Sequence, residues 1–194
     1  MPKNKQFNET DVLDKAKDLF NKKGYNGTSM DELVQATGLS RSSIYDTFGD
    51  KYSLYIRSLE HYKNQSKATI EKAMEKIISP QKKIHFFFDN VVQDILNDRG
   101  RKGCLMVNAT TELAGADTKI ANIACINMEE MEEKFLQWVK EGQAAGEISK
   151  SFAARSLARH LYNTITGLRV TGKTKPDKNF LKDIVKTSLS ILDV

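Results

Sequence analysis

Apolar residues recur every three or four positions along most of this chain, and no stretch alternates with the two-residue period of a strand. The pattern is clearest over residues 80–96, which Ser79 precedes as a cap and Pro80 opens as a first helical residue. Its apolar face carries Ile84, Phe87, Phe88, Val91, Val92, Ile95 and Leu96. We therefore predict an all-α fold of nine helices.

Capping and turn residues set the expected bounds of the other helices. The first runs over residues 9–23, and a long one over residues 50–78 spans about 40 Å at the usual helical rise, enough to join two domains. Further helices are expected over residues 104–113, from Asp117 to Gly142 or Gly146, from a Ser151 cap to a loop at Gly172–Asp177, and from there to the chain end.

Two short helices joined by a tight turn are predicted within residues 28–51. Ser29 and Glu32 have the spacing of a capping box, and Gly38 stands where the first of these helices must end. Ser40 can cap a second helix that buries its apolar residues and exposes a polar face. The buried pair is Ile44 and Phe48, and the polar face is Arg41, Ser42, Ser43, Tyr45 and Thr47. This is the layout of a helix-turn-helix, whose second helix enters the major groove of DNA.

Several spaced positions of this segment resemble the signature of the tetracycline-repressor (TetR) family. They are Ala16-x-x-Leu19-Phe20-x-x-x-Gly24-Tyr25-x-x-Thr28, then Ala36-Thr37-Gly38-Leu39-Ser40, then Ile44-Tyr45-x-x-Phe48-x-x-Lys51. The match covers about the first 55 residues. It implies a three-helix DNA-binding domain over residues 1–51 and a roughly six-helix ligand-binding and dimerisation domain over residues 52–194.

The resemblance also implies roles for individual residues in contact with operator DNA. Tyr45 and Lys51 would bind phosphates, while Thr28 caps against the backbone. The second helix would approach base edges through Arg41, Ser42 and Ser43, with Thr47 on the same face. Asp46 departs from the neutral or basic residue more usual at its position. Lys3 and Lys5 in the N-terminal tail are further candidates for DNA contact.

Charge and composition exclude several classes but do not locate the DNA-binding part. The formal net charge is +5, yet residues 1–51 contain eight Lys/Arg and eight Asp/Glu. No apolar run approaches the ~18 residues that span a bilayer, and no signal peptide opens the chain. Two cysteines, Cys104 and Cys125, make no disulfide framework, so we expect a cytoplasmic protein with no membrane partner.

No pattern of catalysis or of cofactor binding is present. The three histidines, His61, His85 and His160, are far apart in the sequence and have no metal-ligand spacing. A Gly-rich phosphate loop, a nucleophile elbow and a His-Glu-x-x-His motif are all missing from the sequence. We expect no enzyme activity, no metal and no cofactor.

For the regulatory part, the resemblance implies a homodimer through the last two helices and a pocket for a small-molecule effector. Small residues favour close helix approach in the eighth helix: Ala153, Ala154, Ala158 and Gly167. Polar or bulky residues on apolar helices are candidate pocket contacts: Phe88, Asn108, Asn127, Met131, Tyr162 and Asn163. Both sets also occur in a plain bundle core. The expected effector is largely apolar, and the expected regulator is a repressor.

Two alternatives stay open from the sequence. Cys104 opens a helix directly after Arg101 and Lys102, and cations near a helix N-terminus lower the pKa of a thiol, which would suit a redox or electrophile sensor. A buried cysteine that fills the start of the helix has the same pattern. The second alternative is a helical enzyme or carrier with a remnant helix-turn-helix.

Overall fold

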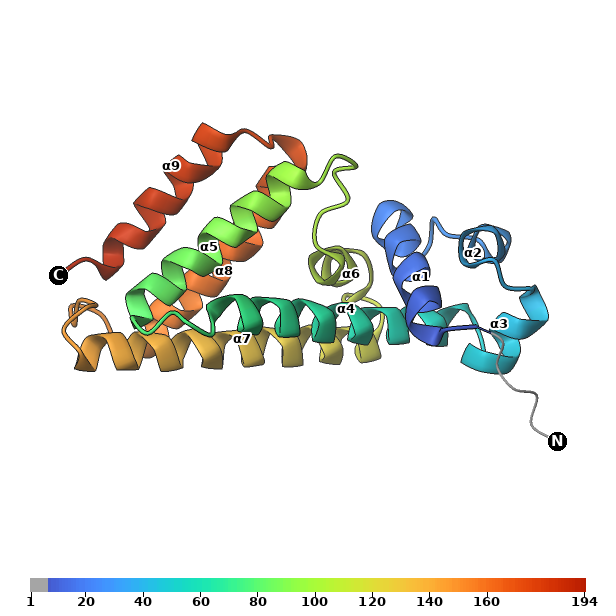
Figure 1. Ribbon diagram of the computed structural model, residues 1–194, viewed down its shortest axis with the longest axis horizontal. Coiled ribbons are helices and arrows are strands. Elements are labelled where there is room, and N and C mark those ends of the chain that lie inside the picture. Colours follow the sequence, from blue (N-terminus) through green and yellow to red (C-terminus); the bar gives the residue numbers. More distant parts are fainter. Residues whose placement is uncertain (1–6) are drawn as a thin grey trace.

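The computed structural model describes residues 7–194, which form nine α-helices, one 3-10 helix and no strand (Figure 1). The expected all-α fold is therefore confirmed for these residues, while Lys3 and Lys5 lie outside them. The helices are α1 (Glu9–Lys23), α2 (Met30–Thr37), α3 (Arg41–Phe48), α4 (Lys51–Met74), α5 (Pro80–Asn97), α6 (Leu105–Leu113), α7 (Thr118–Ala144), α8 (Ala154–Thr174) and α9 (Lys178–Leu189), followed by η1 (Ser190–Leu192).

Helices α1, α2 and α3 gather at one end of the long molecule (Figure 1). Ser29 caps α2 in the expected capping box, because its hydroxyl accepts from the Glu32 N–H and the Glu32 carboxylate accepts from the Ser29 N–H. Gly38 ends α2 with φ 76°, a left-handed conformation that costs glycine little. Ser40 then caps α3 by accepting from the Ser43 N–H. Each of these local predictions is confirmed.

Helices α4 and α7 run in the same direction along the length of the molecule (Figure 1). Three side-chain contacts join them at successive levels. The Tyr52 hydroxyl donates to Asp117 at 3.0 Å, and two ion pairs of 2.7 Å follow farther along, Lys63 with Glu130 and Lys134 with Glu71. The pair of helices therefore forms a spine from the helix-turn-helix to the opposite end.

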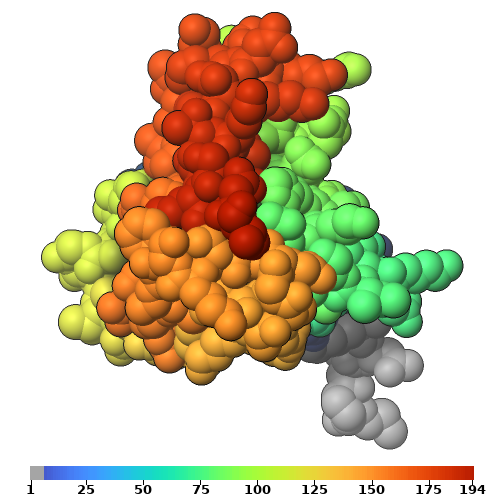
Figure 2. All heavy atoms as spheres, turned by 90° about the vertical axis from the view of Figure 1, so that its left-hand side faces the viewer, coloured from blue at the N-terminus to red at the C-terminus, as the bar shows by residue number. Residues whose placement is uncertain are grey.

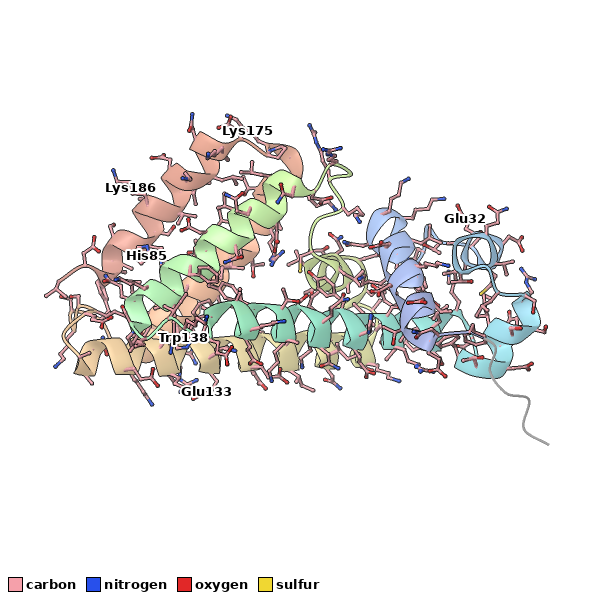
Figure 3. The ribbon with its side chains drawn as sticks, viewed as in Figure 1. Glu32, His85, Glu133, Trp138, Lys175 and Lys186 are labelled. Carbon is pink, nitrogen blue, oxygen red and sulfur yellow. The ribbon has the colours of Figure 1, made fainter. Side chains whose placement is uncertain are left out.

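Helices α5, α7, α8 and α9 enclose one hydrophobic core, which we call the C-terminal core. Three aromatic rings pack at its centre. The ring centroids of Phe87 and Phe135 are 5.4 Å apart and those of Phe135 and Trp138 are 5.6 Å apart, both edge to face. Figure 3 shows Trp138 pointing from α7 into this packing, whereas Lys186 points outward from α9.

A second cluster, the N-terminal core, is built on α1, α2, α3 and the first half of α4, but it does not stop at residue 51. Leu105, Met106 and Ala109 of α6 belong to it, as does Ile120 at the start of α7. Helix α4 contributes Leu54, Tyr55, Ile56 and Leu59 to this core and Met74 to the other. Hydrophobic packing thus couples α6 to the helix-turn-helix, although the two are far apart in sequence.

Some predicted helix ends are wrong, for reasons that depend on packing. Helix α4 ends at Met74, and Ile78 is 91% exposed beyond it. Helix α8 begins after Ala153, so Ser151 is not its cap; its hydroxyl pairs instead with that of Ser149. Gly172 does not start a loop, because α8 continues to Thr174.

Two glycines that were expected to end helices lie inside them and allow close packing. A Cβ at Gly172 would lie 2.5 Å from Cγ2 of Ile95 on α5. A Cβ at Gly142, within α7, would lie 2.5 Å from Cδ1 of Ile148. Both glycines are buried, so the missing side chain, rather than backbone freedom, explains their presence.

Candidate functional site

The outer face of α3 is polar and open, whereas its inner face is apolar and buried. Ile44 is fully buried and Phe48 is 5% exposed, and both belong to the N-terminal core. On the opposite side Arg41 and Ser42 are exposed, and Tyr45 keeps 45% of its surface in solvent. An eight-residue helix with this division is anchored by one face and can present the other to a groove.

Interactions within the helix-turn-helix hold the candidate DNA contacts in place. The Ser40 hydroxyl lies 2.9 Å from the hydroxyls of both Ser42 and Ser43, so these three groups form one cluster at the start of α3. Arg41 donates to Asp31 of α2 at 3.0 Å, with both side chains largely exposed. An exposed ion pair contributes little free energy, so this guanidinium can exchange its partner readily.

The turn before α2 is held by Thr28 and Lys51. Thr28 is 1% exposed and its hydroxyl donates to the Gly24 carbonyl at 2.6 Å. The Lys51 ammonium donates to the carbonyls of Tyr25 and Thr28, each at 2.9 Å, and lies 4.2 Å from the centroid of the Tyr25 ring. Lys51 therefore braces the turn, and Thr28 has no exposed surface to offer.

Helix α6 reaches the same turn from the other side. The Glu112 carboxylate accepts from the N–H groups of Tyr25 at 3.0 Å and Asn26 at 2.9 Å. At the other end of α6, the Asn108 amide donates to Asn21 of α1 at 2.8 Å and to the Lys102 carbonyl at 2.7 Å. Both ends of α6 thus hydrogen-bond to α1 or to the turn that follows it.

A pocket of about 580 Å³ opens where α1, α4, α8 and the α5–α6 loop meet. It is lined mainly by charged and polar side chains. From α1 it takes Lys17, Asp18 and Asn21, and from α4 it takes Tyr62, Gln65 and Ser66. The remaining wall comes from the end of α5, from the loop up to Cys104, and from the C-terminal turns of α8. Its occupant would contact the DNA-binding end and the regulatory end at once.

The six predicted ligand contacts are not gathered at this pocket, and none of them lines it. Phe88 is fully buried in the C-terminal core, and Met131 packs against the same core. Asn127 and Tyr162 face each other across α7 and α8, where burial raises the pKa of the Tyr162 hydroxyl. Asn163 is exposed on the outer face of α8.

Asn108 has little hydrogen-bonding capacity left for a ligand. Besides the two bonds donated by its amide nitrogen, its side-chain oxygen accepts from Lys173 at 3.1 Å. These bonds join α1, the α5–α6 loop and α8 at one residue. The Asn108 side chain therefore links these three segments by hydrogen bonds in this conformation.

The two cysteines have different settings. Cys104 is 8% exposed, occupies the N-cap position of α6 without a side-chain capping bond, and accepts from the Tyr62 hydroxyl at 3.4 Å. Burial and the neighbouring sulfur raise the pKa of Tyr62, so its hydroxyl stays a donor. Cys125 is exposed, and the nearby Glu129 carboxylate raises the pKa of its thiol.

Sequence reasoning missed Arg169, Tyr62 and Glu112. A signal for Arg169 was present, because it follows Leu161 and Ile165 at four-residue spacing and so stands on the inner face of α8. A charged residue at such a position needs a partner. No local pattern marks Glu112, since the N–H groups that donate to its carboxylate lie 86 and 87 residues away in the chain.

Within residues 7–194, no three His, Cys, Asp or Glu side chains form a group that could hold a metal ion. In the same range, no helix is both long enough and apolar enough to cross a membrane.

Family models match two parts of the chain. Residues 12–57 match the model described as bacterial regulatory proteins, tetR family, and residues 80–187 match the tetracyclin repressor-like C-terminal domain. The second match alone covers more than half of the chain. The first ends a few residues into α4, past the helix-turn-helix.

Curated relatives and solved structures agree with these matches. The chain is 28% identical over 194 residues to the uncharacterized HTH-type transcriptional regulator YezE of Bacillus subtilis, covering 100% of both. It is 28% identical to the HTH-type transcriptional repressor ComR of Escherichia coli, covering 96% of this chain and 90% of ComR. The regulator CifR, solved as a cysteine mutant with operator DNA, superposes with a TM-score of 0.85 at 23% identity over 97% of this chain and 98% of CifR.

Proposed function

The chain belongs to the tetR family of bacterial regulatory proteins, whose members are DNA-binding transcription regulators and not enzymes, and from this premise we propose that it is a homodimeric repressor released from its operator by a small ligand. The observation that carries the proposal is the open polar face of α3, fixed in place by the N-terminal core. We use the term repressor because the relative ComR of Escherichia coli is named a transcriptional repressor.

The proposed DNA contacts are the residues on and around α3. Arg41, Ser42 and Ser43 would approach base edges, because they stand at the exposed N-terminal turn of the helix that enters the groove. Tyr45 and Thr47 follow on the same helix. Thr28 and Lys51 would act from behind by fixing the turn, and the Lys51 charge would also attract phosphates.

The proposed dimer interface is the outer face of α8 together with α9. Asn163, Gly167 and Val170 follow one another at spacings of four and three residues and form an exposed stripe. A Cβ at Gly167 would meet nothing within 4 Å, and Val170 keeps 49% of its surface exposed. Figure 2 views this end of the molecule and shows α9 uncovered. Ala158 does not serve this face, because it is fully buried in the C-terminal core.

The proposed route from ligand to DNA has two parts. Helix α4 contributes to both cores and therefore transmits a tilt as a rod. Glu112 of α6 accepts a hydrogen bond from the turn before α2, and Cys104, the N-cap residue of α6, lines the pocket. A ligand shifts the spacing of the two recognition helices only by its difference in affinity for the two conformations. Asn127, Met131 and Tyr162 do not line this pocket, and their role as ligand contacts stays a prediction from the resemblance.

A gel shift with the DNA directly upstream of the gene tests the proposed function. We expect binding to a near-palindromic site with half-sites about one helical turn or more apart, since a two-fold protein needs a two-fold site. Sizing of Val170→Asp should give a monomer, whereas Ile126→Asp, at an equally exposed position on α7, should remain a dimer. Binding to no upstream segment, or two dimeric variants, would contradict the respective part of the proposal.

A second candidate is a sensor that acts through Cys104, and one contact favours it. The Tyr62 hydroxyl donates to the Cys104 sulfur, and Cys104 lines the pocket, where a small reagent could reach it. Alkylation by iodoacetamide at pH 7 tests reactivity, with Cys125 as the internal comparison. A rate at Cys104 no faster than that of a free thiol would remove this candidate and leave the reversible ligand.

A further inference from the structure

The pocket beside α1 carries an excess of positive charge. Six lysines and arginines line it, against three aspartates. The wall that faces the α5–α6 loop also carries Cys104 and Tyr62, whose polar atoms are hydrogen-bonded to each other. A polar or charged group of an occupant would find partners in this lining, and it would compensate wall groups that lose water on binding.

Most of these cations already have a close partner. Lys17 lies 2.7 Å from Asp14, Lys102 lies 3.5 Å from Asp18, and Lys173 donates to Asn108 at 3.1 Å. Two others, Arg99 and Arg101, are exposed at the rim. Screening by solvent makes exposed charges weak ligands for a small molecule.

Arg169 differs from all of them. Its side chain is only 20% exposed, and its one ion-pair partner within residues 7–194 is Asp94, at 3.9 Å. That separation is too long for a hydrogen bond. The Asp94 side chain is itself 68% exposed, so solvent competes with Arg169 for its carboxylate. A guanidinium with five donors thus lines the pocket with most of its hydrogen-bonding capacity unused.

A second polar group on the same wall can accept a hydrogen bond from an occupant of the pocket. Asp98 also lines it, and Oδ2 of Asp98 accepts from the Gly103 N–H at 2.7 Å. Its other oxygen, Oδ1, is the one buried side-chain atom in the described part of the chain that has no hydrogen-bond partner. A buried acceptor of this kind costs free energy unless a donor reaches it. A ligand hydroxyl or a water can supply that donor.

We propose that this pocket binds a small organic acid whose carboxylate pairs with the Arg169 guanidinium. The planar fork of arginine matches the two oxygens of a carboxylate, so one residue both neutralises and orients the acid. A pocket of about 580 Å³ holds a compact molecule. Cys104 and Arg169 both line the pocket, so the acid sits beside the thiol.

Such an occupant would be the effector, and this role rests on the proposed function, but binding of the acid does not. The pocket takes side chains from α1 as well as from α4 and α8. An acid bound to Arg169 of α8 would therefore also contact α1, the helix that packs against the helix-turn-helix. In Figure 1 the α5–α6 loop and α3 lie on different sides of the molecule, so the acid would not compete with DNA for a surface.

Two alkylating reagents that differ in charge test the proposal. Iodoacetate and iodoacetamide are of similar size and share a leaving group, but only iodoacetate carries a carboxylate. In both reactions the Cys104 thiolate forms a bond to the reagent's CH₂ carbon, iodide leaves, and the thiol proton goes to the buffer. We would follow labelling of Cys104 and Cys125 in the full-length protein by mass spectrometry of peptides, without DNA.

We expect the rate ratio of iodoacetate to iodoacetamide to be at least about tenfold higher at Cys104 than at Cys125, because Arg169 gathers the carboxylate beside one sulfur only. Arg169→Gln should lower the Cys104 ratio about tenfold. Arg159→Gln is the matched control, since Arg159 is exposed on the same helix, pairs with Glu132 and lies outside the pocket. It should leave the ratio unchanged.

Wild-type protein provides a test that does not depend on folding of a variant. Butyrate should slow the reaction of iodoacetate with Cys104, whereas butyramide at the same concentration should not. Equal ratios at the two cysteines, equal effects of the two arginine variants, equal protection by acid and amide, or a Cys104 that reacts with neither reagent would overturn the proposal. A gel shift that fails while the ratios behave as expected would refute the proposed function alone.

Discussion

The recognition helix and the pocket each present an arginine, and the two are set in opposite ways. Arg41 has a side chain that is 55% exposed and a close, weak partner in Asp31 at 3.0 Å. Arg169 is 20% exposed and has a distant partner at 3.9 Å. The Arg41 guanidinium can exchange Asp31 for a base edge at little cost in free energy. The Arg169 guanidinium has its carboxylate partner beyond hydrogen-bond distance and can therefore bind a further anion. Exposure and partner distance thus distinguish the proposed DNA-contact surface from the proposed acid-binding pocket.

The two hydrophobic cores extend this comparison. The N-terminal core is assembled from short, well-capped helices, and it also includes α6, which follows much later in the chain. The C-terminal core is made of long helices that pack among themselves. A core substitution in α6 should therefore lower the affinity for operator DNA, whereas an equal substitution in α9 should not.

Matched leucine truncations give the largest expected effect. Leu105→Ala on α6 and Leu181→Ala on α9 each remove a side chain that is at most 1% exposed, so each should cost about 2–5 kcal/mol of unfolding free energy. At a temperature where both variants stay folded, only Leu105→Ala should weaken operator binding. Denaturant titration and gel shift measure the two quantities. Equal operator affinities would mean that the shared core does not couple α6 to DNA.

Substitutions at the DNA-binding end come next in size. Arg41→Ala should relax the base preference at one position per half-site by ~1–3 kcal/mol. Lys51→Ala should instead weaken all sequences alike and lower the salt slope by about one, with an added loss from the turn that its ammonium braces. Binding to a set of single-base operator variants at several salt concentrations distinguishes these outcomes. Uniform weakening by Arg41→Ala would make Arg41 a phosphate contact.

Two glycines of α8 give a smaller contrast between a covered and an open face. Gly172→Ala should destabilise by about 1–3 kcal/mol, because its Cβ would overlap Ile95 of α5. Gly167→Ala should stabilise the helix itself by about 0.5–1 kcal/mol, since nothing in the same chain lies within 4 Å of that Cβ, and sizing shows whether the proposed dimer accommodates the added methyl group. Thermal melting with sizing measures both. A loss of stability or of the dimer in Gly167→Ala would show that a partner chain packs closely there.

The capping box should give the smallest effect, visible as a pH dependence. Hydrogen bonds from Lys23 and from the Ser29 backbone lower the pKa of Glu32 from 4.5 to about 2. A lowered pKa means that its contribution to stability is full above pH 4.5 and is lost as the pH falls toward 2. Glu32→Gln should remove this part of the slope in melting temperature, while Glu60→Gln, exposed on α4, should keep it. Parallel profiles for the wild type and Glu32→Gln would contradict the assignment.

Predictions that rest on neighbours within four residues were confirmed by the structure. Ser29 and Glu32, Gly38, and the Ser40 cap interact along one stretch of chain, so their spacing alone specifies the turn and both helix starts. The expected Ser151 cap was wrong because Gln143 of α7 holds the preceding segment through the Ser149 and Phe152 carbonyls, and the loop at Gly172 was wrong because that glycine packs against Ile95 of α5. A local pattern contains no information about such distant neighbours.

The sequence by itself determined the all-α class and the helix-turn-helix, since periodicity and capping are properties of consecutive residues, and its spaced motif positions carried the resemblance to the family. The tertiary structure alone decided that α6 packs with the DNA-binding helices, that Lys51 braces the turn, and that Arg169 lines a charged pocket beside Cys104. The reason is that burial and pairing depend on atoms brought together from residue 17 to residue 173. A charged side chain reads the same in a sequence whether water or a cavity surrounds it.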